Sequence, residues 1–199
     1  MNLPGSVTVR RAGPDDADAL KPLIEGGYRG GSARRGWTHE ADIIEDERIG
    51  ADELACMLDD PSIHFLIAES EGRAIGCIAV TDKGGARAYF GLLCVDPPFQ
   101  SSGLGSRLIR AAEDLARDLG AVVMDISVIE DRRELIAMYE RKGYRDTGER
   151  EPFPAPQPRP LFFRLFEKRL RGEQAVHEQR TDQDLRHQRS CRDGRGRRG

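Results

Sequence analysis

A short glycine-containing segment, Gln100-Ser101-Ser102-Gly103-Leu104-Gly105, has residue types and a spacing suited to binding a diphosphate. It follows an apolar run, 89–95, and precedes a helical pattern that opens near Leu104. Glycine lets the backbone turn tightly and approach a ligand closely. The unpaired N–H groups of a helix's first turn point outward at the positive end of the helix dipole. Residues 100–106 therefore predict a site where peptide nitrogens bind linked phosphoryl groups.

The flanking residues favour this interpretation over a merely flexible start to a helix. One apolar helix face is predicted by five residues at helical spacing, Leu104, Leu108, Ala111, Leu115 and Leu119. Gly120 is expected to end that helix. A P-loop is excluded because no Gly-Lys-Ser/Thr follows the glycines. A dinucleotide fingerprint lacks its third glycine, since Leu108 stands at that position.

The segment also resembles the cofactor motif of the GNAT acetyltransferases. In that motif Gln or Arg, two residues, Gly, any residue, and Gly or Ala follow a strand, and residues 100–105 match it fully. A second stretch, 135–144, looks like another signature of the superfamily, and the resemblance extends to Gly148. It implies an α/β (α+β) fold with one domain. Its central sheet would be mixed and mostly antiparallel, with one parallel, splayed strand pair and flanking helices.

The resemblance implies that acetyl-CoA is the acyl donor. Strands 86–95 and 121–128 would be parallel neighbours that diverge around the pantetheine arm, which main-chain groups near Leu93–Val95 would bond. Arg132 stands where the family often has Asn; it is expected either to reach a phosphate or an acceptor carboxylate, or to be exposed at a helix start. The cofactor-binding residues implied are Leu93, Cys94, Val95, Gln100, Ser101, Ser102, Gly103, Leu104, Gly105, Ser106 and Arg132.

Tyr139 stands where the superfamily commonly places a tyrosine whose hydroxyl faces the sulfur of CoA. The resemblance implies that Tyr139 protonates the leaving thiolate, and that the Val95 amide donates to the thioester oxygen. The alternative for Tyr139 is packing in the core with Leu135 and Ile136. The apolar neighbours of Cys94 indicate a buried, unreactive thiol, so direct transfer in a ternary complex is expected.

The sequence does not name the general base. An amine with a pKa of about 10.4 is almost fully protonated at pH 7, so a group that removes its proton is needed. Many relatives carry a Glu on the fourth strand, but Tyr89 stands at that position here. Glu40 and Glu151 are the candidates, because their loops should border the open side of the site. Trp37, Glu40 and Tyr89 are candidate acceptor-binding residues; burial of Trp37 against the fold is the alternative.

These residues predict an acetyl-CoA-dependent N-acetyltransferase acting on a primary amine of a small molecule or an amino acid. Acetylation of protein lysines or N-termini is one alternative. A non-catalytic acyl-CoA-binding module is another, favoured by the unplaced base and disfavoured by Tyr139. The acceptor, the acyl chains tolerated and the pairing of subunits through the last strand are left open.

Composition excludes several other classes of protein. The formal charge is −3 over 199 residues, and the tail from Arg171 holds eight Arg against five acids, so the remainder carries −6 and a basic nucleic-acid surface is not expected. The four cysteines show no Cys-x-x-Cys spacing and do not cluster with histidines, so no metal site is expected. With no signal-like N-terminus and no long apolar run, a soluble, cytoplasmic protein with reduced thiols is predicted.

The chain is predicted to form one domain, 1–170, followed by a polar Arg-rich tail, 171–199, that is disordered. A proline-rich spacer, 152–160, is not expected inside a sheet. The expected strands are 7–10, 63–69, 74–81, 86–95, 121–128, 144–148 and 161–170. The expected helices are 14–25 (broken by the glycines that begin at Gly26), a region within 42–58, the helix that opens near Leu104, and 131–142.

Overall fold

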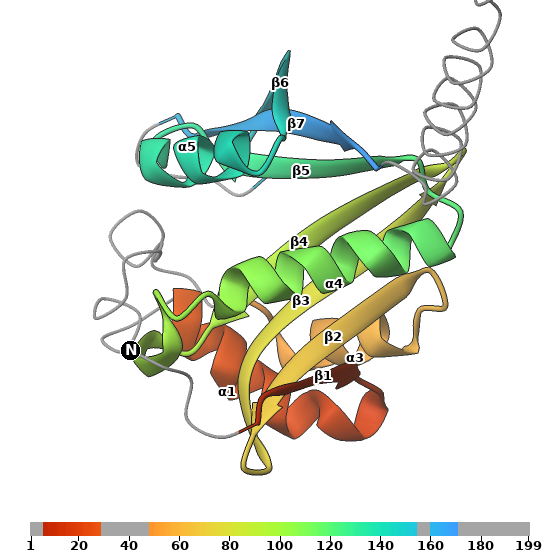
Figure 1. Ribbon diagram of the computed structural model, residues 1–199, viewed down its shortest axis with the longest axis vertical. Coiled ribbons are helices and arrows are strands. Elements are labelled where there is room, and N and C mark those ends of the chain that lie inside the picture. The colour runs from red at the N-terminus through yellow and green to blue at the C-terminus, as the bar shows by residue number, and fades with distance from the viewer. Residues whose placement is uncertain (1–5, 29–47, 155–159, 171–199) are drawn as a thin grey trace, which may run out of the picture. The chain divides into compact units, whose positions relative to one another are not determined.

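The computed structural model describes residues 6–28, 48–154 and 160–170. Its centre is a seven-stranded sheet with the order β1-β2-β3-β4-β5-β7-β6 (Figure 1). The strands are β1 (Thr8–Arg11), β2 (Ile63–Ser70), β3 (Arg73–Gly84), β4 (Arg87–Val95), β5 (Val123–Ile129), β6 (Arg145–Pro152) and β7 (Phe162–Arg169). Neighbouring strands are antiparallel except for β4 and β5, which are parallel. The predicted mixed, mostly antiparallel sheet is thus confirmed.

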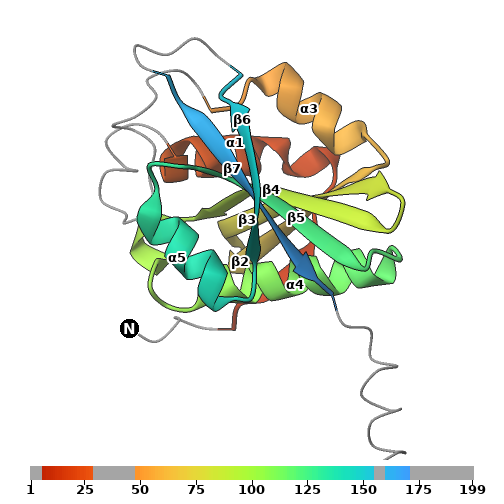
Figure 2. The same cartoon turned by 90° about the horizontal axis from the view of Figure 1, so that it is seen from above.

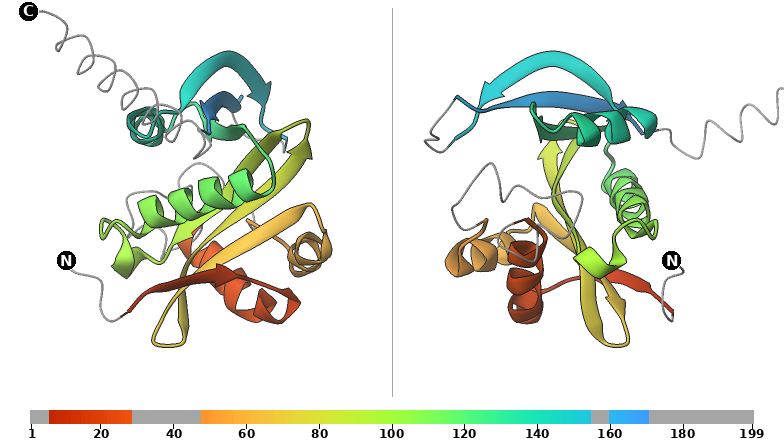
Figure 3. Two further views of the ribbon diagram at one scale, coloured as in Figure 1. Left: turned by 45° about the vertical axis from the view of Figure 1, so that its right-hand side comes forward. Right: turned by 90° about the vertical axis from the view of Figure 1, so that its left-hand side faces the viewer.

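Helices cover both faces of the sheet. Those within the described residues are α1 (Ala17–Tyr28), α3 (Ala51–Asp59), α4 (Leu104–Asp118) and α5 (Arg133–Arg141), with short 3-10 turns at Pro14–Asp16 and Pro97–Phe99. α1 and α3 lie on one side of the sheet, whereas α4 and α5 lie on the other (Figure 2). The edge-on view in Figure 3 shows β2–β4 between α1 and α4. None of the described helices is long and apolar enough to cross a membrane.

The parallel strands β4 and β5 pair over a short stretch and then diverge. Their register runs only from Arg87 opposite Val123 to Tyr89 opposite Asp125. Beyond that point β4 remains paired with β3, while β5 remains paired with β7 as far as Ile129. The predicted splayed pair is confirmed, and the open end of the wedge is visible between β4 and β5 in Figure 1.

A bulge in β4 explains the divergence. Cys77 on β3 pairs with Cys94, but Ala79 pairs with Gly91. Between these two pairs β4 therefore contains one residue more than β3. Leu92, inside the bulge, has a left-handed φ of 49°. Because a bulge bends its strand and increases the local twist, β4 turns away from β5 here.

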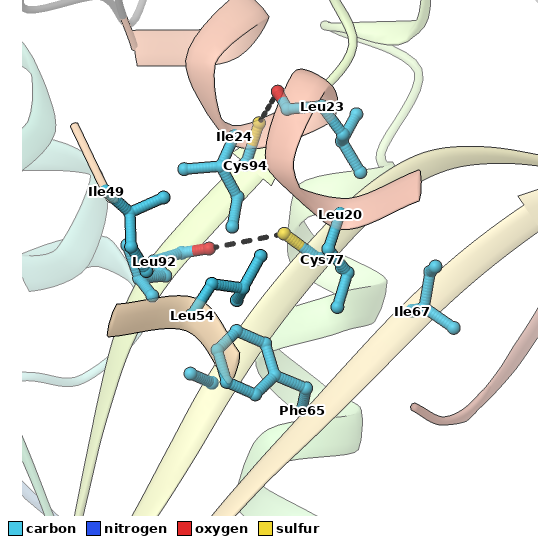
Figure 4. Packing of buried hydrophobic residues seen from close by; sticks show 11 residues of the cluster. Leu20, Leu23, Ile24, Ile49, Leu54, Phe65, Ile67, Cys77, Leu92 and Cys94 are labelled. Carbon is cyan, nitrogen blue, oxygen red and sulfur yellow. Dashed lines mark hydrogen bonds between the residues drawn. The ribbon is translucent and has the colours of Figure 1, made fainter. Parts of the chain in front are cut away.

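The bulge also changes which face of the sheet the side chains occupy. Before it, Phe90 contacts the ring of Tyr139 on the side of α4 and α5. After it, Leu92 and Cys94 join the apolar core under α1, which Figure 4 shows from close by. There the Cys94 thiol donates to the Leu23 carbonyl oxygen at 3.1 Å. The residues that alternate with them, Leu93 and Val95, are therefore left to face α4.

Helix α1 continues through two glycines, so the predicted break at Gly26 is wrong. The helix ends at Tyr28 instead. A Cβ atom on Gly27 would lie 2.1 Å from the Sγ atom of Cys94, so only glycine lets α1 approach β4 this closely. Glycine lowers helix propensity, but packing against β4 outweighs that cost here.

A buried carboxylate, Glu113, joins α4 to the opposite half of the sheet. It is 5% exposed and accepts hydrogen bonds from the Lys168 ammonium on β7 at 2.7 and 2.8 Å. It also accepts a hydrogen bond, 2.9 Å long, from the hydroxyl of Tyr144, which follows α5 in the chain. Burial and the Glu113 charge raise the pKa of Tyr144, so that hydroxyl remains a donor. This contact holds the two halves of the wedge together.

Several predicted features fall on residues outside those described. They include Trp37 and Glu40, the first part of the predicted 42–58 helix, most of the proline-rich spacer, and the whole tail from Arg171. Within the described residues, Pro152 ends β6 at the edge of the sheet, where a missing N–H is tolerated. One compact unit ends at Arg169, and the domain boundary proposed from the sequence stays a prediction.

Candidate active site

The predicted diphosphate loop forms one wall of a cavity of about 200 Å³, here called the loop cavity. In the loop, Ser101 and Gly103 have left-handed φ values of 61° and 88°. The Gln100 side-chain Nε2 atom donates to the Val95 carbonyl oxygen at 3.1 Å, and the Ser102 hydroxyl donates to the Phe99 carbonyl oxygen at 2.5 Å. These bonds fix the bend that leads into α4.

The first turn of α4 lies beside this cavity and presents main-chain amides that have no acceptor within the helix. The first hydrogen bond of the helix runs from the Arg107 N–H to the Gly103 carbonyl oxygen, 3.1 Å, so the amides of residues 104–106 have no acceptor within the helix. A Cβ atom on Gly105 would make ordinary contact with Val95 at 3.8 Å, whereas Gly103 is required for its backbone angle. The geometry suits an anion.

Most predicted cofactor-binding residues line the loop cavity: Leu93, Val95, Gln100, Ser101, Gly103, Gly105, Ser106 and Arg132. Three do not. Cys94 points into the core under α1 because of the β4 bulge, and Leu104, the first residue of α4, has a buried side chain. The Ser102 hydroxyl bonds back to the main chain. For these three, only main-chain groups remain available to a ligand in this cavity.

Sequence reasoning missed Lys142, which also lines the loop cavity. Its ammonium donates to the Ser106 hydroxyl at 2.6 Å. Burial lowers the pKa of Lys142; the Glu113 charge opposes this effect, and the positive charges of Lys168, Arg110 and Arg141 add to it. The spacing of residues 135, 138, 139 and 142, all of which line the cavity, follows one helix face and could have revealed this residue.

A second cavity of about 270 Å³, here called the strand cavity, lies in the wedge between β4 and β5. It shares five lining residues with the loop cavity: Tyr28, Leu93, Arg132, Leu135 and Tyr139. The two cavities therefore meet at the open end of the parallel pair. A ligand in one cavity would face a ligand in the other across these side chains.

Tyr139 lies at this junction and is only 7% exposed. Its ring packs against the rings of Phe90 and Tyr144, with centroids 6.0 and 5.8 Å apart. Its hydroxyl makes no hydrogen bond to the described residues. Burial raises the pKa of Tyr139 and the nearby Tyr89 raises it further, while Arg132 opposes both. The hydroxyl is therefore a protonated donor at neutral pH.

Arg132 is buried, at 6% exposed, so the expectation of an exposed arginine is wrong. Its Nε atom donates to the Glu134 carboxylate at 2.6 Å, and the side chain lines both cavities. A second arginine, Arg48, lines the strand cavity, where its guanidinium lies 5.0 Å from the centre of the Tyr28 ring. No Asp or Glu stands among the described residues that line this cavity.

A larger groove of about 1,060 Å³, here called the outer groove, lies along β5, β6 and β7. It shares Tyr89, Ile126, Ser127, Pro154 and Phe163 with the strand cavity and so opens into it. Glu151, the predicted base, is exposed on β6; it lines the outer groove but not the strand cavity. Tyr89, the candidate acceptor-binding residue of β4, lines both spaces.

Comparison with known proteins agrees with this geometry. The model of the Acetyltransferase (GNAT) family matches residues 31–144, more than half of the chain. The chain belongs to the GNAT acetyltransferase family. This confirms the resemblance carried by the glycine loop and by the 135–144 stretch, and it confirms the enzyme class.

Three curated relatives of this GNAT protein carry substrate names. It is 33% identical to the IAA acetyltransferase of Azospirillum brasilense over 105 residues, which cover 51% of this chain and 67% of that one. It is 30% identical to the aminoalkylphosphonate N-acetyltransferase of Salmonella typhimurium over 101 residues, which cover 48% and 66%. A mycothiol acetyltransferase is matched over only 29% of its length, at 33% identity.

Solved structures of low sequence identity share the fold. The structure of yncA from Salmonella typhimurium with its cofactor acetyl-CoA superimposes with a TM-score of 0.64 at 18% identity, covering 84% of this chain and 96% of the other. The ribosomal-protein-S18-alanine N-acetyltransferase of Escherichia coli gives 0.65 at 14% identity, with coverage of 84% and 96%. The GNAT fold therefore accommodates acceptors of different classes, and the acceptor must be argued from the site.

Proposed function

We propose that this GNAT acetyltransferase moves an acetyl group from acetyl-CoA to the primary amine of a small molecule or amino acid, by direct attack in a ternary complex. One observation carries the proposal: the loop cavity and the strand cavity meet at Tyr139 and Arg132, where β4 and β5 diverge. A donor in the first cavity and an acceptor in the second would place thioester and amine in contact, and such proximity is a large part of catalysis.

The loop cavity supports binding of the CoA end of the donor. The left-handed backbone at Ser101 and Gly103 and the free amides of 104–106 suit a diphosphate, and Lys142 adds a cation beside them. Lys168, Arg110 and Arg141 repel the Lys142 charge while Glu113 attracts it, so an anion beside Lys142 would relieve part of that repulsion. Leu93 and Val95, which face the same cavity, are the residues whose main chain would bond the pantetheine arm.

Two groups of this chain are proposed to act at the thioester. The Val95 amide donates to the thioester oxygen and stabilises the negative charge that develops there. The Tyr139 hydroxyl, which has no described partner and lines both cavities, gives its proton to the departing thiolate. Glu151 remains the proposed terminal base, since it lies in the groove that opens into the strand cavity.

The lining of the strand cavity favours an amine that also carries an anionic group. Arg48 and the buried Arg132, whose Nε is paired with the Glu134 carboxylate, supply guanidinium groups, and apolar or aromatic side chains such as Phe153 and Phe163 supply most of the rest. Guanidinium groups bind carboxylates and phosphonates well. The aminoalkylphosphonate in one relative's name combines an amine with such a group, which agrees with this inference.

A panel of matched amines tests the acceptor class. We expect amino acids to be acetylated with a kcat/KM at least about tenfold higher than that of the same compounds amidated at the carboxylate, since one charged hydrogen bond contributes about 1.5–3 kcal/mol. Free CoA release gives the rate. In Arg48→Gln the difference should fall to within about threefold.

Two outcomes would reassign the acceptor or the function. Peptides acetylated faster than every small amine would favour the protein-acetylating alternative. Acetyl-CoA binding with no transfer to any amine or peptide would favour the non-catalytic module.

A further inference from the structure

The acceptor's ammonium group must lose a proton before it can attack, and the residues that line the strand cavity limit which group can take that proton. Among the described residues, the charged or titratable groups that line the strand cavity are Arg48, Arg132, Tyr28, Tyr89 and Tyr139, and no carboxylate lines it. Glu151 lines the outer groove and not this cavity. A proton that leaves an ammonium group in the strand cavity therefore needs a path to the outer groove.

A pair of hydroxyl groups spans the boundary between the two spaces. The Tyr89 Oη atom and the Ser127 Oγ atom lie 2.9 Å apart, and either can be the donor. Both residues line the strand cavity and both line the outer groove. Tyr89 is also the last residue of β4 that pairs with β5, so the pair lies where the wedge begins to open.

We propose that the Tyr89–Ser127 pair carries the acceptor's proton from the strand cavity to the outer groove; this inference rests on the proposed function. One hydroxyl oxygen accepts the proton from the ammonium nitrogen while its own O–H proton moves to the second hydroxyl. The second hydroxyl releases its proton to water in the outer groove. The nitrogen keeps the electron pair of the broken N–H bond and becomes the neutral nucleophile, and both hydroxyl groups end as they began.

The groups around the pair determine where that proton goes. Arg87 forms ion pairs with Asp125 at 2.5 Å and with Glu167 at 3.0 Å, and Asp146 pairs with Arg164, so these carboxylates are already neutralised. The remaining charged groups of the groove wall are Lys83, Arg145, Glu149 and Glu151. Glu149 and Glu151 are exposed on β6 and form no ion pair with the described residues. They are the carboxylates available to a proton released into the groove.

Kinetics of Tyr89→Phe and Ser127→Ala as a function of pH test the relay. With an acceptor of pKa near 10, we expect kcat/KM at pH 7 to fall by about 10- to 100-fold in either variant, in the range of a lost proton-transfer group. At pH 10 the defect should shrink to within about threefold, because about half of the amine is already neutral. An acceptor amine of pKa below about 6 should show no more than a threefold defect even at pH 7.

A matched control separates proton transfer from strand pairing. Arg87→Met breaks a different link between β4 and β5, the one to Asp125, and Arg87 does not line the strand cavity. Any loss of activity in this variant should be the same at pH 7 and pH 10 and for both acceptors. Thermal unfolding of each variant monitors folding, and Ser127→Ala, which removes only one hydroxyl, provides the test if Tyr89→Phe is unstable.

The outcomes distinguish the relay from the proposed function. A loss in Tyr89→Phe and Ser127→Ala that is independent of pH and of acceptor pKa, like that of Arg87→Met, would overturn the relay while leaving the acetyltransferase reaction intact. Unchanged rates in both variants would do the same. Absence of acetyl transfer by the unaltered protein to every amine would instead overturn the proposed function.

Discussion

Replacement of Tyr139 by Phe is expected to lower kcat by about 10²- to 10⁴-fold, because the leaving thiolate loses its proton donor. The ring contacts to Phe90 and Tyr144 are kept by Phe, so the fold should be unaffected. The hydroxyl makes no hydrogen bond to the described residues, so its removal leaves no described donor or acceptor unpaired. Affinity for acetyl-CoA should stay within about threefold of the original value. Steady-state rates and calorimetric titration measure the two quantities.

Tyr144→Phe is the matched control for this change. Tyr144 packs edge-on against Tyr139, but its hydroxyl bonds Glu113 and it does not line either cavity. This variant should lose stability and keep kcat within about threefold. A Tyr139→Phe variant that turns over within threefold of the unaltered enzyme would show that Tyr139 serves packing alone.

Replacement of Glu113 by Ala is expected to destabilise the fold by about 3–5 kcal/mol, the usual cost of removing one partner of a buried ion pair. The Lys168 ammonium, with 24% of its side chain exposed, would lose its carboxylate, and the buried Tyr144 hydroxyl would lose its acceptor. For a chain of this length the midpoint of thermal unfolding should fall by roughly 6–20 °C.

Glu113→Gln separates charge from hydrogen bonding. The amide still accepts the hydrogen bond from Tyr144 but removes the charge opposite Lys168, so an intermediate loss is expected. Because Glu113 joins α4 to β7, the Ala variant should also weaken acetyl-CoA binding before it unfolds. A Glu113→Ala variant within 1 kcal/mol of the unaltered protein would contradict this account of how the wedge is held together.

The sequence predicted the parts of the fold that local chemistry determines. A glycine with a left-handed φ at position 103, an apolar helix face and a loop after an apolar strand are all local signals, and α4 begins at Leu104 as expected. The splayed strand pair was predicted from the resemblance to the GNAT family and not from the spacing of residues in the sequence. Its cause, the bulge at Leu92, depends on pairing with β3 and leaves no clear mark in the sequence.

Features that depend on tertiary packing were harder to predict. The α1 helix passes Gly26 because Gly27 meets Cys94, a contact between residues far apart in the chain. Burial of Arg132 follows from its position at the junction of two cavities, which its own segment does not reveal. The base stayed unassigned from sequence because the acceptor side is assembled from β4, β5, β6 and β7 together.

Calorimetric titration with acetyl-CoA tests most directly whether the loop cavity binds the diphosphate of the donor. We expect saturable heat, a higher unfolding temperature with ligand, and at least about tenfold weaker binding in Gly103→Ala, because a φ of 88° at this position strains any side chain. Gly13→Ala, with open space around its added methyl group, should bind as the unaltered protein does. No heat and no thermal protection at millimolar acetyl-CoA would contradict the account.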